Sequence, residues 1–195
     1  GAKAKISKIS FIGDKKFKDA TLRNIILSEE YKFWKVISGK KFLNENMINF
    51  DKRLMYNFYK NKGFYNIKIE SSFASYLGNN EFELIYNISS GKKYYFNDLI
   101  LKLPVDYDEK NFEKLRSMFI DLKGENYSLN SIDKILSEID KVVLYEEYEF
   151  LKSTVNEDIN DDLINLTFNI EESEKFYIEK INILGNTITQ ESVIR

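Results

Sequence analysis

The strongest constraint on the fold is an apolar pattern that occurs three times along the chain. In each copy the second apolar residue follows the first by three positions and the third follows by two more. The three sets are Ile6, Ile9 and Phe11; Phe96, Leu99 and Leu101; and Ile178, Ile181 and Ile183. The last two residues of each set alternate as in a strand with one buried face. Copies about 80 to 90 residues apart are domain-sized, so we expect tandem domains of one kind.

The first copy is followed by signals for a turn and a short helix. Gly13 and Asp14 end the expected strand, and both residue types tolerate the positive φ of a tight turn. Asp19 is expected to cap a helix with one apolar face. That face carries Leu22, Ile25 and Ile26.

A second helix and two strands complete the first repeat. The helix is expected to begin near Asn44 and to end at Gly63. Its expected buried stripe is Met47, Phe50, Leu54 and Phe58. Residues 64–76 and 81–89 are rich in aromatic and β-branched residues and predict two strands joined by a turn at 77–80. The order is therefore β-α-α-β-β.

The second repeat has the same order. Its first strand covers 96–103, and Asp108 is expected to cap a helix that stops at Gly124. The apolar face of that helix is Phe112, Leu115 and Phe119. Tyr127 opens the second helix region, whose stripe is Ile132, Ile135, Ile139 and Val143. We align this stripe with Met47, Phe50, Leu54 and Phe58 at a constant offset.

The remaining strands of the second repeat are expected at 150–156 and 163–171, joined by an acidic turn at 157–162. A further repeat opens near Phe176. The expected domains are therefore 1–91, 92–173 and a truncated third at 174–195.

Composition removes several classes of function. The chain has no cysteine, which excludes disulfides and thiolate metal sites, and no histidine, the commonest general base and metal ligand. The net charge is −2 with both signs interspersed, which argues against a nucleic-acid-binding surface. No apolar run approaches the roughly 20 residues of a membrane-spanning helix. These absences count against an enzyme but leave carboxylates, lysines and tyrosines available for chemistry; we expect no cofactor and no metal.

One acidic run has the spacing of a calcium loop at its start. Asp158, Asn160 and Asp162 place oxygens at alternate positions, but an EF-hand also needs Gly at the sixth position and Glu at the twelfth. Those positions hold Leu163 and Asn169. A solvated hairpin turn is the better interpretation.

Two further features have alternative readings. The acidic pairs could be proposed as glycosidase carboxylates, but they lie at the ends of elements and are expected on the solvated surface. They are Glu29 with Glu30, Glu146 with Glu147, and Glu171 with Glu172. Phe33 and Trp34 belong either to the core or to a partner surface, where Trp is enriched.

Several short stretches together resemble the POTRA (polypeptide-transport-associated) domain family. They are residues 9–17, the pair Phe33–Trp34, 51–59 running into Gly63 and Phe64, 87–91, and 176–186. They are most similar to the third and fourth POTRA modules of outer-membrane β-barrel assembly factors, with the opening of the fifth. The second repeat departs from the pattern because it lacks the Gly-Asn turn and has Glu149 where Gly usually precedes the aromatic residue.

The resemblance implies an α+β fold of tandem modules, each β-α-α-β-β with a three-stranded mixed sheet packed against two helices. It also implies a non-catalytic receptor and scaffold on the periplasmic side of the bacterial outer membrane. Its partners would be unfolded outer-membrane β-barrel proteins and accessory assembly lipoproteins, with membrane contact only through a barrel outside this chain. The alternative is the POTRA region of a two-partner secretion or a translocation-and-assembly transporter.

The second strand of each module is an edge strand in this family, and an open edge can accept an extended peptide through main-chain hydrogen bonds. The resemblance therefore implies partner-binding residues along this strand in both repeats. In the first repeat they are Asn66, Ile67, Lys68, Ile69, Phe73, Ala74 and Tyr76, of which the last three map near a lipoprotein-docking segment. In the second repeat they are Phe150, Lys152, Thr154 and Val155.

Overall fold

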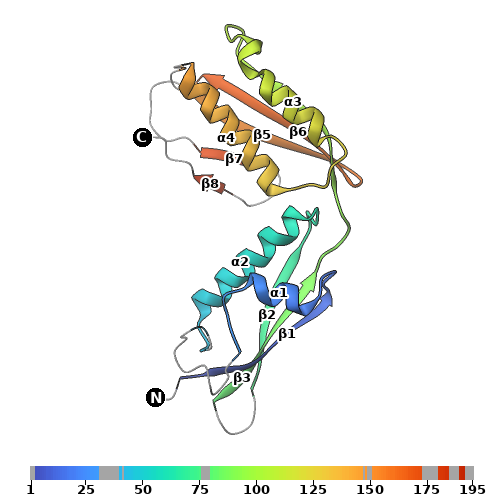
Figure 1. Ribbon diagram of the computed structural model, residues 1–195, viewed down its shortest axis with the longest axis vertical. Helices are drawn as coiled ribbons and strands as arrows, with labels where there is room; N and C mark the ends of the chain where they lie inside the picture. Colours follow the sequence, from blue (N-terminus) through green and yellow to red (C-terminus); the bar gives the residue numbers. More distant parts are fainter. Residues whose placement is uncertain are drawn as a thin grey trace. The chain divides into compact units, whose positions relative to one another are not determined.

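The computed structural model describes residues 3–30, 40, 42–75, 80–146, 148, 151–172, 180–184 and 189–191. The chain divides into two compact units, Gly1–Lys92 (unit 1) and Lys93–Arg195 (unit 2) (Figure 1). Each unit contains the order strand, helix, helix, strand, strand, which confirms the expected α+β class. Among the described residues, no helix combines the length and the apolar character needed to span a membrane.

Unit 1 is a three-stranded sheet with both of its helices on one face (Figure 1). Its elements are β1 (Lys5–Asp14), α1 (Asp19–Ile25), α2 (Glu45–Asn61), β2 (Lys68–Ser75) and β3 (Glu81–Ser89). The sheet order is β1-β3-β2, with β1 parallel and β2 antiparallel to β3. The central strand is therefore β3, and β1 and β2 form the two edges of the sheet.

Unit 2 repeats this arrangement and extends it. Its elements are β4 (Tyr95–Lys102), the 3-10 helix η2 (Glu109–Phe112), α3 (Glu113–Leu122), α4 (Leu129–Tyr145), β5 (Leu151–Asn160), β6 (Leu163–Glu172), β7 (Lys180–Leu184) and β8 (Thr189–Glu191). The sheet order is β4-β6-β5-β7-β8. A separate third domain at 174–195 stays a prediction, since β7 and β8 are the described parts of it and β7 pairs with β5.

A β-bulge explains the three-then-two spacing of the repeated pattern. The pairing register of β1 on β3 shifts between Ile6 and Lys8, and that of β4 on β6 shifts between Phe96 and Leu99. One extra residue at a bulge moves the following side chains to the other face of the strand. Ile6 and Ile9 can therefore both face the core, and each is at most 1% exposed.

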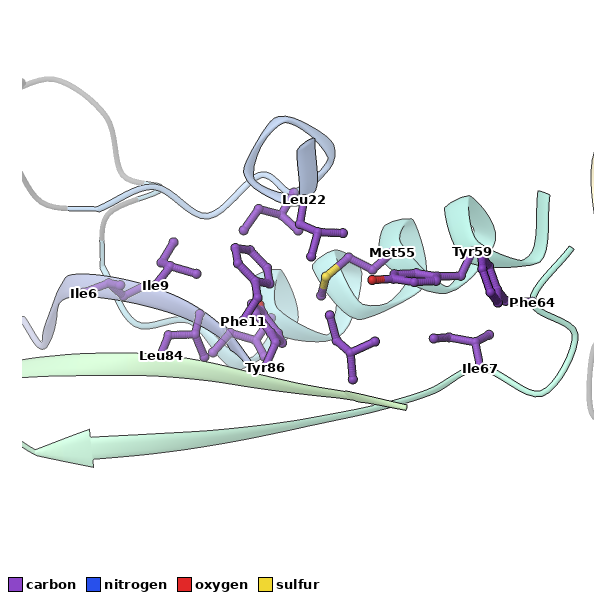
Figure 2. Close-up of a cluster of buried hydrophobic side chains, with 13 residues drawn as sticks. Ile6, Ile9, Phe11, Leu22, Met55, Tyr59, Phe64, Ile67, Leu84 and Tyr86 are labelled. Atoms are coloured by element: carbon purple, nitrogen blue, oxygen red, sulfur yellow. The ribbon is translucent and has the colours of Figure 1, made fainter. Parts of the chain in front are cut away.

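The buried face of α2 differs from the predicted stripe by one residue. The residues that face the core are Ile48, Asp51, Met55 and Tyr59. Figure 2 shows Met55 and Tyr59 pointing from α2 into the core, with Phe64 next to Tyr59. Phe50, predicted to be buried, is 37% exposed. The buried Asp51 misled the prediction, because a search for apolar periodicity passes over a carboxylate.

The helix caps establish the correct alignment of the two units. Asn44 caps α2, where its Oδ1 accepts hydrogen bonds from the N–H groups of Asn46 and Met47 at 3.0 and 3.3 Å. Ser128 caps α4 in the same way. Counting from these caps places Asp51 of unit 1 at the position of Ile135 in unit 2, so the constant offset inferred from the sequence was wrong by one residue.

The predicted helices of unit 2 are confirmed, but its last hairpin is longer than expected. Phe112, Leu115 and Phe119 are buried, as are Ile132, Ile135 and Ile139. Strand β5 continues to Asn160, and the turn is formed by Asp161 and Asp162 instead of 157–162. In unit 1, β2 begins at Lys68 and not at Phe64, because the chain first turns after Gly63.

Candidate functional site

Among the described strands, none pairs with the outer edge of β2, on the side away from β3, so we call this edge open. Strand β2 pairs with β3 along its whole length, from Lys68 opposite Ser89 to Ser75 opposite Phe82. Within the described part of the chain, no other strand or loop is bonded to the backbone of β2 on its far side. An unpaired row of N–H and C=O groups is a template for pairing with another extended chain.

A groove lies beside this edge, between β2 and α2. We call it the edge groove; its volume is about 500 Å³. The lining residues are Asn49, Lys52, Arg53 and Tyr56 from α2 and Ile67, Lys68, Ile69 and Glu70 from the β2 segment. The α2 residues recur at steps of three and four positions, so they share one flank of the helix next to its buried face. A strand added to β2 would place alternate side chains over this groove.

The edge groove has an apolar base and a mainly basic rim. Ile67 is 5% exposed, and Ile69 packs against the core of unit 1. Its lining residues include three cationic ones, Lys52, Arg53 and Lys68, and one acidic one, Glu70. The guanidinium of Arg53 also lies over the exposed ring of Phe50, 5.1 Å from its centroid. The groove is therefore suited to an extended chain that carries acidic side chains.

The structure brings some of the predicted unit 1 residues together at the groove. Ile67, Lys68 and Ile69 line it, and Asn66 is exposed just before them. Phe73 and Ala74 lie further along β2, where Phe73 is 48% exposed although its partner on β3, Leu84, is buried. Tyr76 lies outside the described residues, as do Phe33 and Trp34.

The predicted unit 2 residues lie on a different kind of edge. Lys152 is exposed, Thr154 is half-buried and Val155 is fully buried. The backbone of Val155 is paired with Ile183 of β7, and Asn156 with Leu184, in parallel register. Strand β7 therefore occupies this edge towards the middle of β5. Phe150 lies outside the described residues.

Sequence reasoning missed a buried polar cluster centred on Asp51. Its carboxylate accepts hydrogen bonds from the N–H groups of Leu27 at 2.7 Å and Ser28 at 3.2 Å, and from the hydroxyl of Tyr86 at 3.2 Å. Burial, reinforced by the charge of Asp51, raises the pKa of Tyr86 above its usual range. The cluster fixes the start of the segment that connects α1 to α2. From the sequence, the buried position of Asp51 could have been indicated only by counting the helix positions of α2 from its N-cap, Asn44.

A second missed site is Glu30, which was predicted to be a solvated surface carboxylate. Its side chain is 27% exposed and bonded to the backbone of β1 and to Arg23. That prediction was wrong because Glu30 lies in a connecting segment folded against β1, which a residue pair such as Glu29–Glu30 does not reveal. Among the described residues, no group of three acidic side chains is placed to hold a metal ion.

Comparison with known proteins gives a consistent result over the whole chain. Residues 4–91 match the model of the POTRA family, described as "Surface antigen variable number repeat". The outer membrane protein assembly factor BamA of Buchnera aphidicola subsp. Acyrthosiphon pisum (strain APS) is 25% identical over 100% of this chain and 32% of its own length. BamA of Neorickettsia risticii (strain Illinois) is 26% identical over 97% of this chain and 26% of its own length. The chain thus spans between a quarter and a third of these relatives.

Solved structures show the same fold. The POTRA3-5 fragment of Haemophilus influenzae BamA has a TM-score of 0.65 and 16% identity, covering 96% of this chain and 73% of that fragment. The POTRA1-2 fragment of Omp85 from Anabaena has a TM-score of 0.54 and 11% identity, covering 89% of this chain and 99% of that fragment. The resemblance to tandem POTRA domains is confirmed.

Proposed function

We propose that this chain of tandem POTRA modules, similar to those of BamA proteins, is a receptor and scaffold in the assembly of outer-membrane β-barrel proteins. It would act on the periplasmic side of the bacterial outer membrane, where it binds unfolded barrel precursors and docks accessory lipoproteins. The observation that carries the proposal is the open β2 edge beside the edge groove. Similarity to BamA along the whole chain supports the biological setting.

Strand addition suits a client set with many sequences. A precursor strand would pair with the free N–H and C=O groups of β2, and main-chain hydrogen bonds do not depend on the client's side chains. Alternate side chains of that strand would face the edge groove, whose basic rim favours carboxylates. Binding of this kind is weak and reversible, which a receptor that passes its client onward requires.

For lipoprotein docking, we propose the stretch further along the same strand. Phe73 is 48% exposed at the end of β2 distant from the edge groove, and Ala74 follows it. A half-exposed aromatic side chain on a regular strand is an anchor that a folded partner can bury. The client and the lipoprotein would therefore contact neighbouring stretches of one strand.

Site-specific photo-crosslinking tests the proposal, since the chain has no cysteine of its own. Ala74→Cys places one probe on β2, and Ile12→Cys is the matched control on β1. Both positions lie on the face of the sheet that the helices leave uncovered, as their partners Glu83 and Asn87 show. Each variant would be labelled with a maleimide photo-crosslinker and irradiated with an unfolded outer-membrane barrel protein.

We expect several-fold more crosslinked barrel protein at position 74 than at position 12. An unfolded soluble protein of similar length should give less product than the barrel protein at position 74. Equal labelling at both positions would contradict strand addition at β2. Equal labelling by both unfolded proteins would contradict a role specific to barrel clients.

A further inference from the structure

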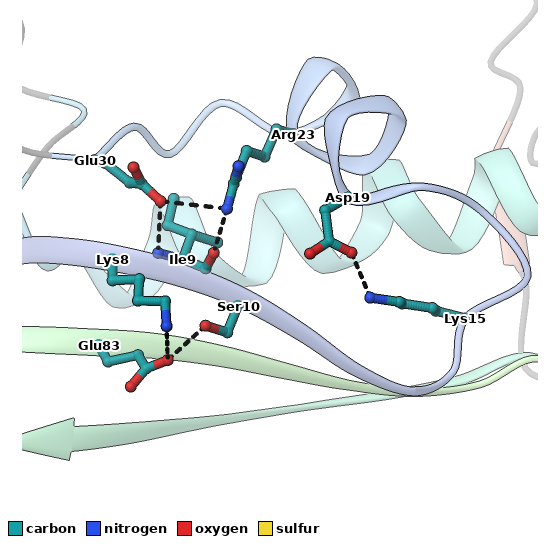
Figure 3. A network of polar contacts seen from close by, with 8 residues as sticks. All are labelled: Lys8, Ile9, Ser10, Lys15, Asp19, Arg23, Glu30 and Glu83. Carbon is teal, nitrogen blue, oxygen red and sulfur yellow. Dashed lines mark hydrogen bonds and ion pairs between the residues drawn. The ribbon is translucent and has the colours of Figure 1, made fainter.

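The opposite edge of unit 1, along β1, is closed by side chains. We propose that Arg23 and Glu30 act as a substitute for a neighbouring strand, closing the β1 edge to strand addition and directing partner strands to β2. We call these two residues the edge cap (Figure 3). The inference deepens the proposed function, on which its consequence for partners rests, because it names the residues that select between the two edges.

The edge cap satisfies both backbone groups of Ile9. The N–H of Ile9 donates to Oε1 of Glu30 at 3.1 Å, and Nη2 of Arg23 donates to the carbonyl oxygen of Ile9, also at 3.1 Å. Arg23 and Glu30 are joined in turn by an ion pair of 3.5 Å. An adjacent strand would offer one acceptor and one donor in the same places. The edge cap therefore supplies what a partner strand would supply.

Three further carbonyl groups of the β1 segment accept hydrogen bonds within unit 1. The carbonyl oxygen of Ala4 accepts the N–H of Leu43 at 2.9 Å, and that of Phe11 accepts Nζ of Lys15 at 3.0 Å. The carbonyl oxygen of Gly13 accepts the N–H of Lys15 at 3.0 Å. Together with Ile9, carbonyl groups near both ends and in the middle of β1 are thus occupied. An incoming strand would have to displace these partners before it could pair.

The anchoring of the connecting segment keeps the edge cap in place. Asp51 holds the N–H groups of Leu27 and Ser28, only two residues before Glu30. Arg23 is supplied by the last turn of α1. A charged residue at a sheet edge is a known protection against unwanted pairing, and here the charges are bonded to the edge itself.

Removal of the edge cap should open the β1 edge without unfolding the unit. The side chains of Arg23 and Glu30 are 45% and 27% exposed, so the double variant R23A/E30A removes little buried surface. The matched control is Lys8→Ala. Lys8 also lies on β1, but it pairs with Glu83 at 3.7 Å across the face of the sheet and does not bond the edge (Figure 3).

Two NMR measurements would be made on each of three proteins: the parent chain, R23A/E30A and Lys8→Ala. The first is the hydrogen exchange rate of the Ile9 amide, which we expect to rise about tenfold in R23A/E30A and to stay unchanged in the control. The second is a titration with an unstructured peptide of alternating valine and threonine. In R23A/E30A, we expect peptide-dependent shifts on residues 7–12 that the parent and the control do not show.

The outcomes separate the two proposals. Absence of shifts on β2 in the parent would count against the proposed function alone. An unchanged Ile9 exchange rate in folded R23A/E30A would overturn the edge cap, whatever the peptide does. Faster exchange without peptide shifts on 7–12, in a chain that binds the peptide on β2, would overturn the role of the edge cap in selecting the edge.

Discussion

The two units have the same order of elements, but they close the edge of their first strand in different ways. In unit 2 the short segment between α3 and α4 lies against β4 and bonds its backbone through main-chain groups, with one added ion pair between Lys123 and Asp98 at 2.8 Å. Phe96 donates to the carbonyl oxygen of Glu125 at 2.9 Å and accepts from the N–H of Gly124 at 2.8 Å. In unit 1 the connecting segment is longer, 26–44 against 123–128, and much of the closure is made by side chains.

The longer connecting segment explains the buried carboxylate of unit 1. Asp51 anchors that segment through Leu27 and Ser28, whereas the equivalent position of unit 2 holds Ile135 in the core. A short segment whose backbone pairs with the sheet needs no such anchor. A buried polar residue that occurs in only one of two repeated cores can therefore indicate a segment that only that repeat has to anchor.

The second edges of the two units differ too. The β2 edge has no described strand on its outer side, while β5 carries β7 at Val155 and Asn156. The β5–β7 pair is an example, within this chain, of an extended segment added in parallel to the second strand of a module. We therefore regard unit 1 as the unit with the accessible edge.

The largest difference between the units is expected on replacing the anchor. Asp51→Ala leaves the N–H groups of Leu27 and Ser28 and the hydroxyl of Tyr86 without their buried acceptor. We expect the free energy of unfolding of unit 1 to fall by about 4 kcal/mol, measured by urea denaturation. The control is Asp121→Ala on the exposed surface of α3 in unit 2, which should change the free energy of unfolding of that unit by less than about 0.5 kcal/mol. A loss below about 1 kcal/mol for Asp51→Ala would contradict the anchor.

The next largest difference in stability between the units is expected on replacing one glycine in each. Gly13 and Gly124 have nearly the same φ, +89° and +87°, but a Cβ at Gly13 would lie 2.3 Å from the carbonyl oxygen of Ile88, while one at Gly124 meets nothing within 4 Å. Gly124→Ala should cost about 1 kcal/mol for the backbone conformation alone. Gly13→Ala should cost about 3 kcal/mol, because the clash adds to it. Equal losses in thermal unfolding would show that β1 can move away from β3.

Alkaline pH should weaken unit 1 through Tyr59. Burial raises the pKa of this tyrosine from 10.0 to about 12, and its hydroxyl donates to the carbonyl oxygen of Lys15. The unfolded chain loses this proton at lower pH than the folded chain, so stability is unaffected below pH 10 and falls between pH 10 and about 12. The loss is on the order of 2 kcal/mol. Denaturation of the parent and Tyr59→Phe across this range should show a shallower fall in the variant; parallel curves would contradict it.

The smallest effect concerns the rim of the edge groove. The double variant K52E/R53E reverses two of its three cationic side chains. We expect an acidic unstructured peptide to bind about tenfold more weakly, a change of about 1.4 kcal/mol, in fluorescence anisotropy. Lys134→Glu, on the exposed surface of α4, is the control in the other unit and should leave binding unchanged. Equal weakening by both variants would assign the effect to net charge and not to the groove.

Local signals were sufficient to predict most of the fold. Gly13 has the positive φ expected of it, Asn44 caps α2, and Ile132, Ile135 and Ile139 form the buried face of α4. Each of these features depends on neighbours in sequence, so residue type and spacing reveal it. The three-residue spacing of Ile6 and Ile9 is a consequence of the β-bulge, but only the pairing register identifies the bulge.

The sites that depend on distant contacts were not predictable in the same way. Asp51 is an acceptor because residues 27 and 28 reach it, and Glu30 caps β1 because that same segment folds back onto the strand. Neither contact leaves a periodic trace in the sequence. The β2 edge was indicated by a family resemblance, but its flanking residues on α2 were missed because the predicted stripe was displaced by one residue.

The most direct test of the account is an NMR titration of the ¹⁵N-labelled parent chain with an unstructured peptide copied from an outer-membrane β-strand. We expect shifts on the described residues of β2, Lys68–Ser75, and on the α2 flank of the edge groove, with residues 7–12 of β1 unaffected. Shifts concentrated on β1, or no shifts on either edge at millimolar peptide, would contradict the claim that unit 1 receives strands at β2.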